Sequence, residues 1–425
     1  MESRTPPDNE RLSARPPPQW TGRMSARPYE PRNAQRTLAG ATVLQIVPAL
    51  REEPSARVAL TVAHMLLQAG GHALVAGLDG PLVGELKDYG GEWIPLAADS
   101  ANPFTRRRNA RAIEGLIGSE RVDIIHAQCV GAASSARRAA ARIAVWLVTT
   151  LPDAPPSSAR EFASIVGDLA HGDRIIAPSS YAAAPVIERG VRREQITVIP
   201  RGVDTHLFDP QTVHPSRLDD LRRAWRISPR QRIALAPGRV APWNGQLLLP
   251  DMARALADNG HDDVVFVVVG ENRQHRRYAR SILAQALALD VDAMFRITGH
   301  CPDMPAAFAT ADVVAVPAVE PPTLGRVVAQ AQSMGKPVVT SDVGALPEHV
   351  VVPPHLPEDV RTGWVVAKGD ALDFARALEL ALALGDSEYR TMSARAREFA
   401  EYMFSPGSVA AATRAVYTSL LAREL

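Results

Sequence analysis

The stretch VEPPTLGRVVAQAQSMGKPVVTSDVGALPE, residues 319–348, decides the fold class of this chain. After Gly325 its apolar residues recur at helical spacing, and Gly335 ends that pattern just before the β-branched run KPVVTS. The predicted order is therefore loop, helix, strand and then a turn at Gly344. A helix that leads directly into a buried strand is the repeating unit of a parallel α/β sheet.

The same alternation extends outward from this stretch in both directions. After residue 231, strand-like runs such as DDVVFVVVG and ADVVAVP alternate with helical runs such as GQLLLPDMARALADNG, and a similar series runs from Ala41 to Asp204. Parallel neighbours need crossover connections, which these helices supply. The sequence therefore predicts an α/β protein with two facing, Rossmann-like, doubly wound domains, whose ligands bind outside the carboxyl ends of the strands.

Four segments follow from this pattern. The first is a Pro- and Arg-rich tail without an apolar run, which cannot bury enough surface to offset its ordering entropy and is expected to be disordered. The next two are the Rossmann-like domains, and the last is a helix expected to pack back on the first domain. The expected bounds are 1–36 for the tail, 37–210 and 211–400 for the domains, and 401–425 for the C-terminal helix.

The bulk composition narrows the function. The chain has 425 residues, and its 47 basic residues nearly balance its 46 acidic ones, so no nucleic-acid partner is expected. Its two cysteines, Cys129 and Cys301, lie far apart without a metal-ligand pattern, so no metal site is predicted. The N-terminus lacks the apolar run of a signal peptide, and no window is apolar enough to span a membrane. We therefore expect a cytoplasmic protein.

Four motifs, in order along the chain, carry a resemblance to a known family. They are QITVIPRGVDTHLF (195–208), PGRVAPWNGQ (237–246), RITGHCPDMPAAFATADVVAVP (296–317) and the opening stretch. They resemble retaining glycosyltransferases of family 4, which have the GT-B fold, and are most similar to bacterial members that act on lipopolysaccharide core or related surface glycans. The resemblance covers roughly Thr42 to the C-terminus.

This resemblance implies a substrate for each domain. The donor would be a nucleotide-diphosphate sugar bound by the second domain, with no further cofactor. The acceptor would be a cell-surface glycan or a lipid-linked molecule bound by the first domain, with access to the inner face of the membrane. The sugar would be transferred with retention of its anomeric configuration.

The expected donor site combines a guanidinium with the beginning of a helix. By resemblance Arg239 is the catalytic residue. A guanidinium at a strand end offers a rigid, planar set of N–H hydrogen-bond donors to the departing diphosphate. Gly325 opens a helix whose unpaired amides can face a phosphate. Cys301 lies on a turn whose backbone would read the nucleotide base. The other expected donor-binding residues are Gly238, Asn244, Arg326, Val327 and Gln330.

Several positions depart from the family pattern. Asn244 replaces a lysine, while Pro322 and Gln330 replace two glutamates eight residues apart. Gln330 can still accept a hydrogen bond, but Pro322 has neither a polar side chain nor an N–H. In the first domain Pro152 replaces a histidine, and the loop ALREEPSAR (49–57) carries two glutamates in place of a Gly-Gly pair. These carboxylates would repel a diphosphate by about 1 kcal/mol each.

Three features leave two interpretations open. His126 matches an acceptor-side position of the family, or it caps a strand end. Glu320 either reaches into the place left by Pro322 or is a solvated loop carboxylate. The basic run TRRRNAR (105–111) either contacts an anionic membrane or is a solvated helix face.

Two functions remain open at this stage. The first is glycosyl transfer, in which Arg239 and the helix amides stabilise charge on the leaving diphosphate. The second is a catalytically degenerate GT-B-fold protein with a binding or regulatory role, because one lost polar contact can cost ~2.7–4 kcal/mol of barrier. An NAD-dependent enzyme is excluded, since no GxGxxG turn follows the first strand.

Overall fold

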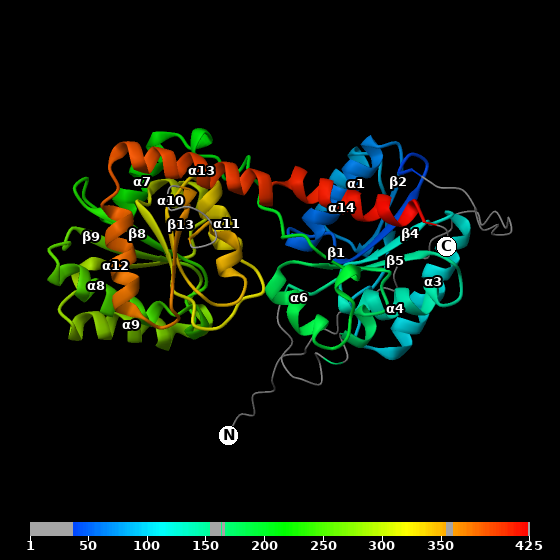
Figure 1. The fold of residues 1–425 in the computed structure, drawn as a ribbon, viewed down its shortest axis with the longest axis horizontal. Coiled ribbons are helices and arrows are strands. Elements are labelled where there is room, and N and C mark those ends of the chain that lie inside the picture. Colours follow the sequence, from blue (N-terminus) through cyan, green and yellow to red (C-terminus); the bar gives the residue numbers. More distant parts are fainter. Residues whose placement is uncertain (1–36, 154–162, 164–165, 354–359, 424–425) are drawn as a thin grey trace, which may run out of the picture.

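The computed structural model describes residues 37–153, 163, 166–353 and 360–423 as two α/β lobes (Figure 1). The tail predicted to be disordered, residues 1–36, lies outside the described residues. Each lobe is built around one sheet with helices on both faces, and the two C-terminal helices run from one lobe to the other (Figure 1).

The first sheet has seven strands in the order β3-β2-β1-β4-β5-β6-β7, and all its neighbouring pairs are parallel. Its strands are β1 (Thr42–Ala49), β2 (His72–Leu78), β3 (Glu92–Pro95), β4 (Ile124–Ala127), β5 (Trp146–Thr150), β6 (Arg174–Ala177) and β7 (Ile196–Val198). The helices between them are α1 (Pro54–Gln68), α2 (Leu82–Asp88), α3 (Pro103–Ser119), α4 (Val130–Ala140) and α6 (Ser180–Ile187).

The second sheet has six parallel strands in the order β10-β9-β8-β11-β12-β13. Its strands are β8 (Arg232–Pro237), β9 (Val264–Val269), β10 (Phe295–Gly299), β11 (Val313–Val316), β12 (Val338–Ser341) and β13 (Gly363–Val366). Its helices are α7 (Pro215–Ala224), α8 (Leu249–Asp258), α9 (Arg276–Ala288), α10 (Met304–Thr310), α11 (Arg326–Ser333), α12 (Ala371–Leu382) and α13 (Asp386–Phe404).

Short 3-10 turns complete the connections. They are η1 (Arg193–Gln195), η2 (Pro210–Thr212), η3 (Pro242–Asn244), η4 (Gln246–Leu248), η5 (Arg273–His275), η6 (Asp292–Met294) and η7 (Leu346–His349). The opening stretch of the sequence forms α11, β12 and η7, in the predicted order of helix, strand and turn.

Both sheets share the strand order of a doubly wound fold. In the first sheet β1 lies between β2 and β4, and in the second β8 lies between β9 and β11. The strand order reverses at β1 and at β8, and ligand crevices form at the carboxyl ends of strands beside such reversals. The predicted α/β class with two Rossmann-like domains is confirmed.

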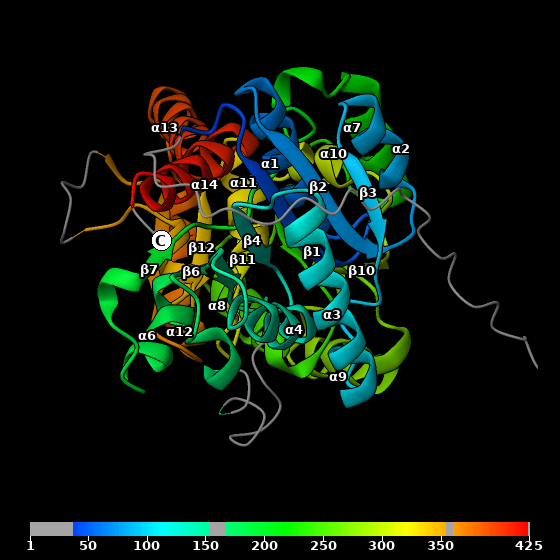
Figure 2. The ribbon, with the colours of Figure 1, turned by 90° about the vertical axis from the view of Figure 1, so that its right-hand side faces the viewer.

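Each face of the first sheet has its own apolar core. Figure 2 shows α1 and α14 on one side of this sheet and α3 and α4 on the other. Helix α14 (Pro406–Leu421) packs against α1, and it buries a row of side chains in that core: Val409, Val416, Tyr417, Leu420 and Leu421. The last helix of the chain therefore belongs to the core of the first lobe.

The chain crosses between the lobes at two adjacent places. Helix α13 ends at Phe404, Ser405 is extended, and Pro406 begins α14. Proline cannot continue the hydrogen bonding of a preceding helix and favours an extended residue before it, which explains the break. The other crossing is the segment after β7, where the Val203 amide donates to the Phe404 carbonyl at 2.8 Å. The two crossings are thus hydrogen-bonded to each other.

Candidate functional site

A cavity of about 220 Å³ lies where the strands of the second sheet end. It is lined by the residues after β8, by the end of β11 and by the beginning of α11. The structure brings most of the predicted donor-binding residues together here: Gly238, Arg239, Asn244, Gly325, Arg326 and Val327. The resemblance and the strand-end rule thus point to the same place.

Two arginine side chains line this cavity. Arg239 follows β8 and Arg326 is the first residue of α11, and both are exposed. Neither side chain forms a hydrogen bond or ion pair with any residue that the structure describes. The beginning of α11 adds amides without helical partners and the positive end of the helix dipole. The cavity can therefore accept an anion without first breaking an internal ion pair.

Asn244, which stands where a lysine was expected, fixes the backbone beside Arg239. Its side-chain amide donates to the Arg239 carbonyl at 2.7 Å, and Gln246 donates to the same oxygen at 2.9 Å. Gly245 between them has φ +68°, and a Cβ there would lie 1.9 Å from the Pro317 carbonyl oxygen. The turn after β8 is thus held in one conformation, although it lacks the cation of the family pattern.

Pro322 lines the same cavity but contributes no polar side chain to it. Its carbonyl accepts a hydrogen bond from the Ala345 amide at 2.9 Å. Gly344 has φ +59°, and a Cβ at this position would lie 2.3 Å from the Pro322 carbonyl oxygen. Pro322 therefore packs closely against the turn after β12. A residue larger than glycine at position 344 would collide with Pro322.

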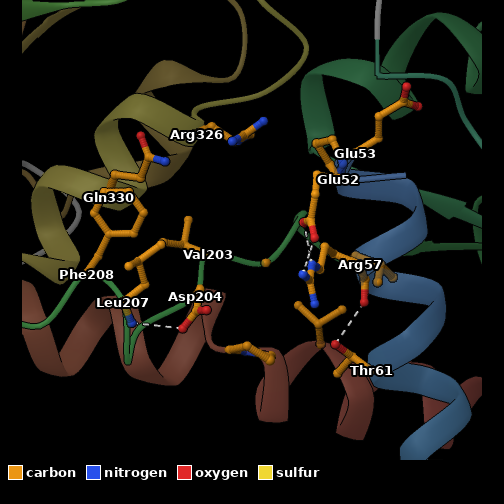
Figure 3. A pocket seen from close by; sticks show the side chains of 15 residues that line it. Glu52, Glu53, Arg57, Thr61, Val203, Asp204, Leu207, Phe208, Arg326 and Gln330 are labelled. Atoms are coloured by element: carbon orange, nitrogen blue, oxygen red, sulfur yellow. Dashed lines mark hydrogen bonds and ion pairs between the residues drawn. The ribbon is translucent and has the colours of Figure 1, made fainter. Parts of the chain in front are cut away.

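A second, larger cavity of about 440 Å³ lies between the two lobes (Figure 3). Helix α1 and the loop before it form one wall, and α11 forms the other. Residues 202–204, 207 and 208 and the beginning of α14 also line the cavity. Gln330, predicted as a donor-binding residue, lies in this cavity. Arg326 lines both cavities, and Figure 3 shows its side chain extending from α11 toward the side of Glu52 and Glu53.

The two glutamates expected to repel a diphosphate differ in their surroundings. Glu52 forms two hydrogen bonds with Arg57, at 2.5 and 2.8 Å, and Arg57 also contacts Glu85 at 2.8 Å. These contacts raise the pKa of the Arg57 guanidinium, and the hydrogen bond with Glu52 has the largest effect. The Glu53 carboxylate has no such partner in the described part of the chain. Of these two glutamates, Glu53 is therefore the one without an ion-pair partner among the described residues.

His126 lies inside the first lobe and lines neither cavity. The side chain is 2% exposed, and both ring nitrogens are engaged, with the Tyr417 hydroxyl at 2.6 Å and the Thr150 hydroxyl at 2.7 Å. Burial lowers its pKa to about 3, with a smaller effect from Arg201. Of the two interpretations of this residue, the structure favours the structural one, because no ring nitrogen is available to an acceptor.

Cys301 also lines neither of these cavities. Its thiol is buried and donates to the Asp303 carbonyl at 3.4 Å, and burial raises its pKa. Glu320 is exposed and lies outside both cavity linings, while its amide donates to the Trp243 carbonyl at 3.1 Å. The solvated-loop interpretation of Glu320 is therefore the one that fits the structure.

The structure also shows contacts between the lobes that the sequence did not suggest. The Ser179 hydroxyl donates to the Thr323 carbonyl at 2.9 Å, and the Glu348 carboxylate accepts from two amides of α6. These partners lie 144 to 168 residues apart along the chain. No local pattern could have paired them.

Comparison with known proteins identifies both halves of the chain. Residues 55–207 match the family model described as "Glycosyltransferase Family 4", and residues 231–383 match "Glycosyl transferases group 1". The chain belongs to glycosyltransferase family 4. The family resemblance of the sequence motifs is thus confirmed.

Curated relatives of this family 4 protein include two kinds of glycosyltransferase. A D-inositol 3-phosphate glycosyltransferase of Nocardia farcinica is 29% identical over 255 residues, which cover 57% of this chain and 52% of that protein. A lipopolysaccharide 1,2-N-acetylglucosaminetransferase of Salmonella typhimurium is 26% identical over 245 residues, 56% of this chain and 60% of that protein. The chain spans about half the length of the curated relatives it matches first.

Solved structures of other glycosyltransferases share the two-lobed GT-B fold. A glycosyltransferase from Rickettsia africae has a TM-score of 0.75 at 24% identity, covering 90% of this chain and 99% of that one. Anabaena HepE in complex with UDP has a TM-score of 0.71 at 19% identity, covering 89% of this chain and 100% of that one. At these identities the likeness shows the fold alone.

Proposed function

We propose that this protein transfers a sugar from a nucleoside diphosphate sugar to a hydroxyl group of a cell-surface glycan or lipid-linked acceptor, with retention of configuration. The observation that carries the proposal is the pair of guanidinium groups of Arg239 and Arg326, which have no partner among the described residues and lie beside the beginning of α11 in one strand-end cavity. The UDP in the HepE structure supports a uridine nucleotide as the first donor to test.

The chemistry follows from the charges of the cavity. The acceptor oxygen bonds to the anomeric carbon, the bond from that carbon to the β-phosphate oxygen breaks, and the hydroxyl proton leaves to the departing diphosphate. Negative charge therefore grows on the diphosphate during the reaction. Hydrogen-bond donors that are already oriented toward this charge stabilise the transition state. Arg239, Arg326 and the α11 amides would supply that stabilisation without a metal ion.

A specific observation favours a second candidate, a GT-B protein that binds nucleotide but has lost turnover. Pro322 occupies a family glutamate position and packs against Gly344, so no carboxylate reaches the transferred sugar from this turn. The phosphate-binding groups need not be affected by that loss. Binding without transfer is the expected behaviour of this second candidate.

Calorimetric titration with UDP, GDP, ADP and UDP-glucose tests the donor. We expect one nucleotide to bind the wild type, and Arg239→Ala to raise its Kd by about tenfold to a hundredfold, as expected for the loss of a hydrogen bond to a charged group. Arg276→Ala is the matched control, because Arg276 is exposed on α9 and lines neither cavity. Equal affinity in the Arg239 variant would remove the site assignment.

A second assay separates the two candidates. Release of nucleoside diphosphate from the bound donor, measured with a panel of glycan and lipid-linked acceptors, supports the transferase. Tight nucleotide binding without release across that panel supports the degenerate protein.

Helix α3 supports a further part of the proposal, contact with an anionic membrane on its cytoplasmic side. Phe104 is 77% exposed, and Arg107, Arg108 and Arg111 follow it on the same exposed helix face. None of these three arginines has a partner within the described ranges. No helix in the part of the chain described here is long and apolar enough to cross a bilayer. Cosedimentation with phosphatidylglycerol vesicles, against phosphatidylcholine vesicles, tests the contact.

A further inference from the structure

Helix α6 of the first lobe is capped from both lobes. Its own N-cap residue, Ser179, accepts from the Ala182 amide at 3.1 Å through its side-chain oxygen. Two amides of the first turn point instead at the second lobe. The Ser180 and Tyr181 amides donate to the two carboxylate oxygens of Glu348, at 2.7 and 2.8 Å.

This cap exists only in the present arrangement of the lobes. The first amides of a helix have no partner within the helix, and a carboxylate there is favoured by the helix dipole. Hydrogen bonds to an ionised carboxylate are shorter and stronger than neutral ones. If the lobes separated, the amides of Ser180 and Tyr181 would return to water and Glu348 would lose both partners.

Further hydrogen bonds reinforce the same junction. The Ser179 hydroxyl, which caps α6, also donates to the Thr323 carbonyl at 2.9 Å. The Thr323 hydroxyl in turn donates to the carbonyl of Asp153, whose carboxylate is bound by Arg201 at 2.6 Å. Thr323 lies just before α11, so the first lobe holds both the loop that leads into this helix and the turn that carries Glu348.

The turn with Glu348 also touches the beginning of α11 directly. His349 is 4% exposed, and a Cβ on Gly325 would lie 2.4 Å from its ring. The His349 ring also stacks on Phe404, with ring centroids 4.7 Å apart and planes 9° apart. Phe404 lies where the chain crosses between the lobes and accepts from Val203. Gly325, His349 and Phe404 thus form one packed contact between the beginning of α11 and the place where the chain crosses between the lobes.

We propose that Glu348 is a positioning residue that couples closure of the two lobes to the geometry of the phosphate-binding end of α11. Closure docks its carboxylate on α6, and the docked turn then holds His349 against Gly325. The part of the proposal that concerns phosphate rests on the proposed function, whereas the interlobe cap does not. Glu348 itself touches no substrate, because it lines neither cavity.

Hydrogen exchange tests the cap directly. In Glu348→Ala we expect the amides of Ser180 and Tyr181 to exchange about tenfold faster than in the wild type, as expected for a lost helix cap. Glu348→Gln keeps one acceptor oxygen without the charge, so it should restore part of the protection. Glu320→Gln is the control, because Glu320 is an exposed glutamate of the same lobe outside the junction. Unchanged exchange in Glu348→Ala would overturn the proposal.

Two further measurements separate positioning from simple stability. Spin labels placed on α3 and α9 should report a broader interlobe distance in Glu348→Ala, and the Kd for UDP should rise about fivefold although Arg239 and Arg326 are intact. Ser179→Ala, which leaves Glu348 in place, should broaden the distance less and keeps the test available if Glu348→Ala does not fold. An unchanged distance in both variants would contradict coupling. Failure of the wild type to bind any nucleotide would defeat the proposed function but leave the exchange result to decide the cap.

Discussion

The carboxyl ends of the two sheets differ in what their polar side chains do. At the end of β8, in the second lobe, Arg239 is exposed, lines a cavity and has no side-chain partner within the ranges that the structure describes. At the ends of β4 and β5, in the first lobe, His126 and Thr150 are buried and hydrogen-bonded to each other. The same topology thus supports an open binding site in one lobe and a closed polar core in the other. Strand order alone therefore places a site but does not show that the site is free.

The largest expected effect concerns the closed core of the first lobe. His126→Leu would leave the buried hydroxyls of Thr150 and Tyr417 without their partner, so we expect a loss of about 3 kcal/mol of unfolding free energy at pH 7. Affinity for UDP should stay unchanged, because His126 lines neither cavity. Chemical denaturation and calorimetric titration measure the two quantities. A His126→Leu variant with normal stability but without affinity for UDP would contradict this contrast between the two lobes.

The pH dependence of stability sharpens the same test. Burial lowers the pKa of His126 to about 3, well below its ordinary value of 6.5. Between these values the unfolded chain binds a proton that the folded chain excludes, so the unfolding free energy falls as the pH falls. The slope should be about 1.4 kcal/mol per pH unit from this group. His126→Leu should lose that part of the slope, whereas His206→Leu, at an exposed position, should keep it.

An intermediate effect is expected at the beginning of α11. Gly325→Ala places a Cβ 2.4 Å from the His349 ring, and this ring is fixed by its stack on Phe404. Overpacking of this kind costs about 1–3 kcal/mol of unfolding free energy, and it should also weaken UDP binding. Gly84→Ala on α2 is the control, because its Cβ would meet no atom within 4 Å. A stable Gly325 variant with normal affinity would show that the end of α11 is not close-packed.

The sequence predicted the architecture because periodicity and strand–helix alternation are local properties. The family resemblance also grouped Gly238, Arg239, Gly325 and Arg326, and the structure brings them to one cavity, where strand ends converge beside a sheet reversal. The sequence could not decide between two roles for His126, because burial depends on Tyr417, which lies 291 residues away.

The position of Gln330 shows the same limit. Family spacing grouped it with the donor-binding residues, yet one face of α11 points to the strand-end cavity and another to the cavity between the lobes. Glu348 is a related case, since its partners Ser180 and Tyr181 belong to the other lobe. Residue type and spacing describe one element at a time, and these roles arise where two lobes meet.

The smallest expected effect would restore a charge to the open site. Asn244→Lys places an ammonium beside Arg239, and one added charge near a partly solvated diphosphate is worth about 1 kcal/mol, or about fivefold in the Kd for UDP. The gain should shrink as salt is added, because exposed charges are screened. Asn244→Met removes the hydrogen bond to the Arg239 carbonyl without adding charge, so it measures what that bond contributes. If the lysine variant binds no better than the methionine variant at low salt, the diphosphate does not lie at the end of β8.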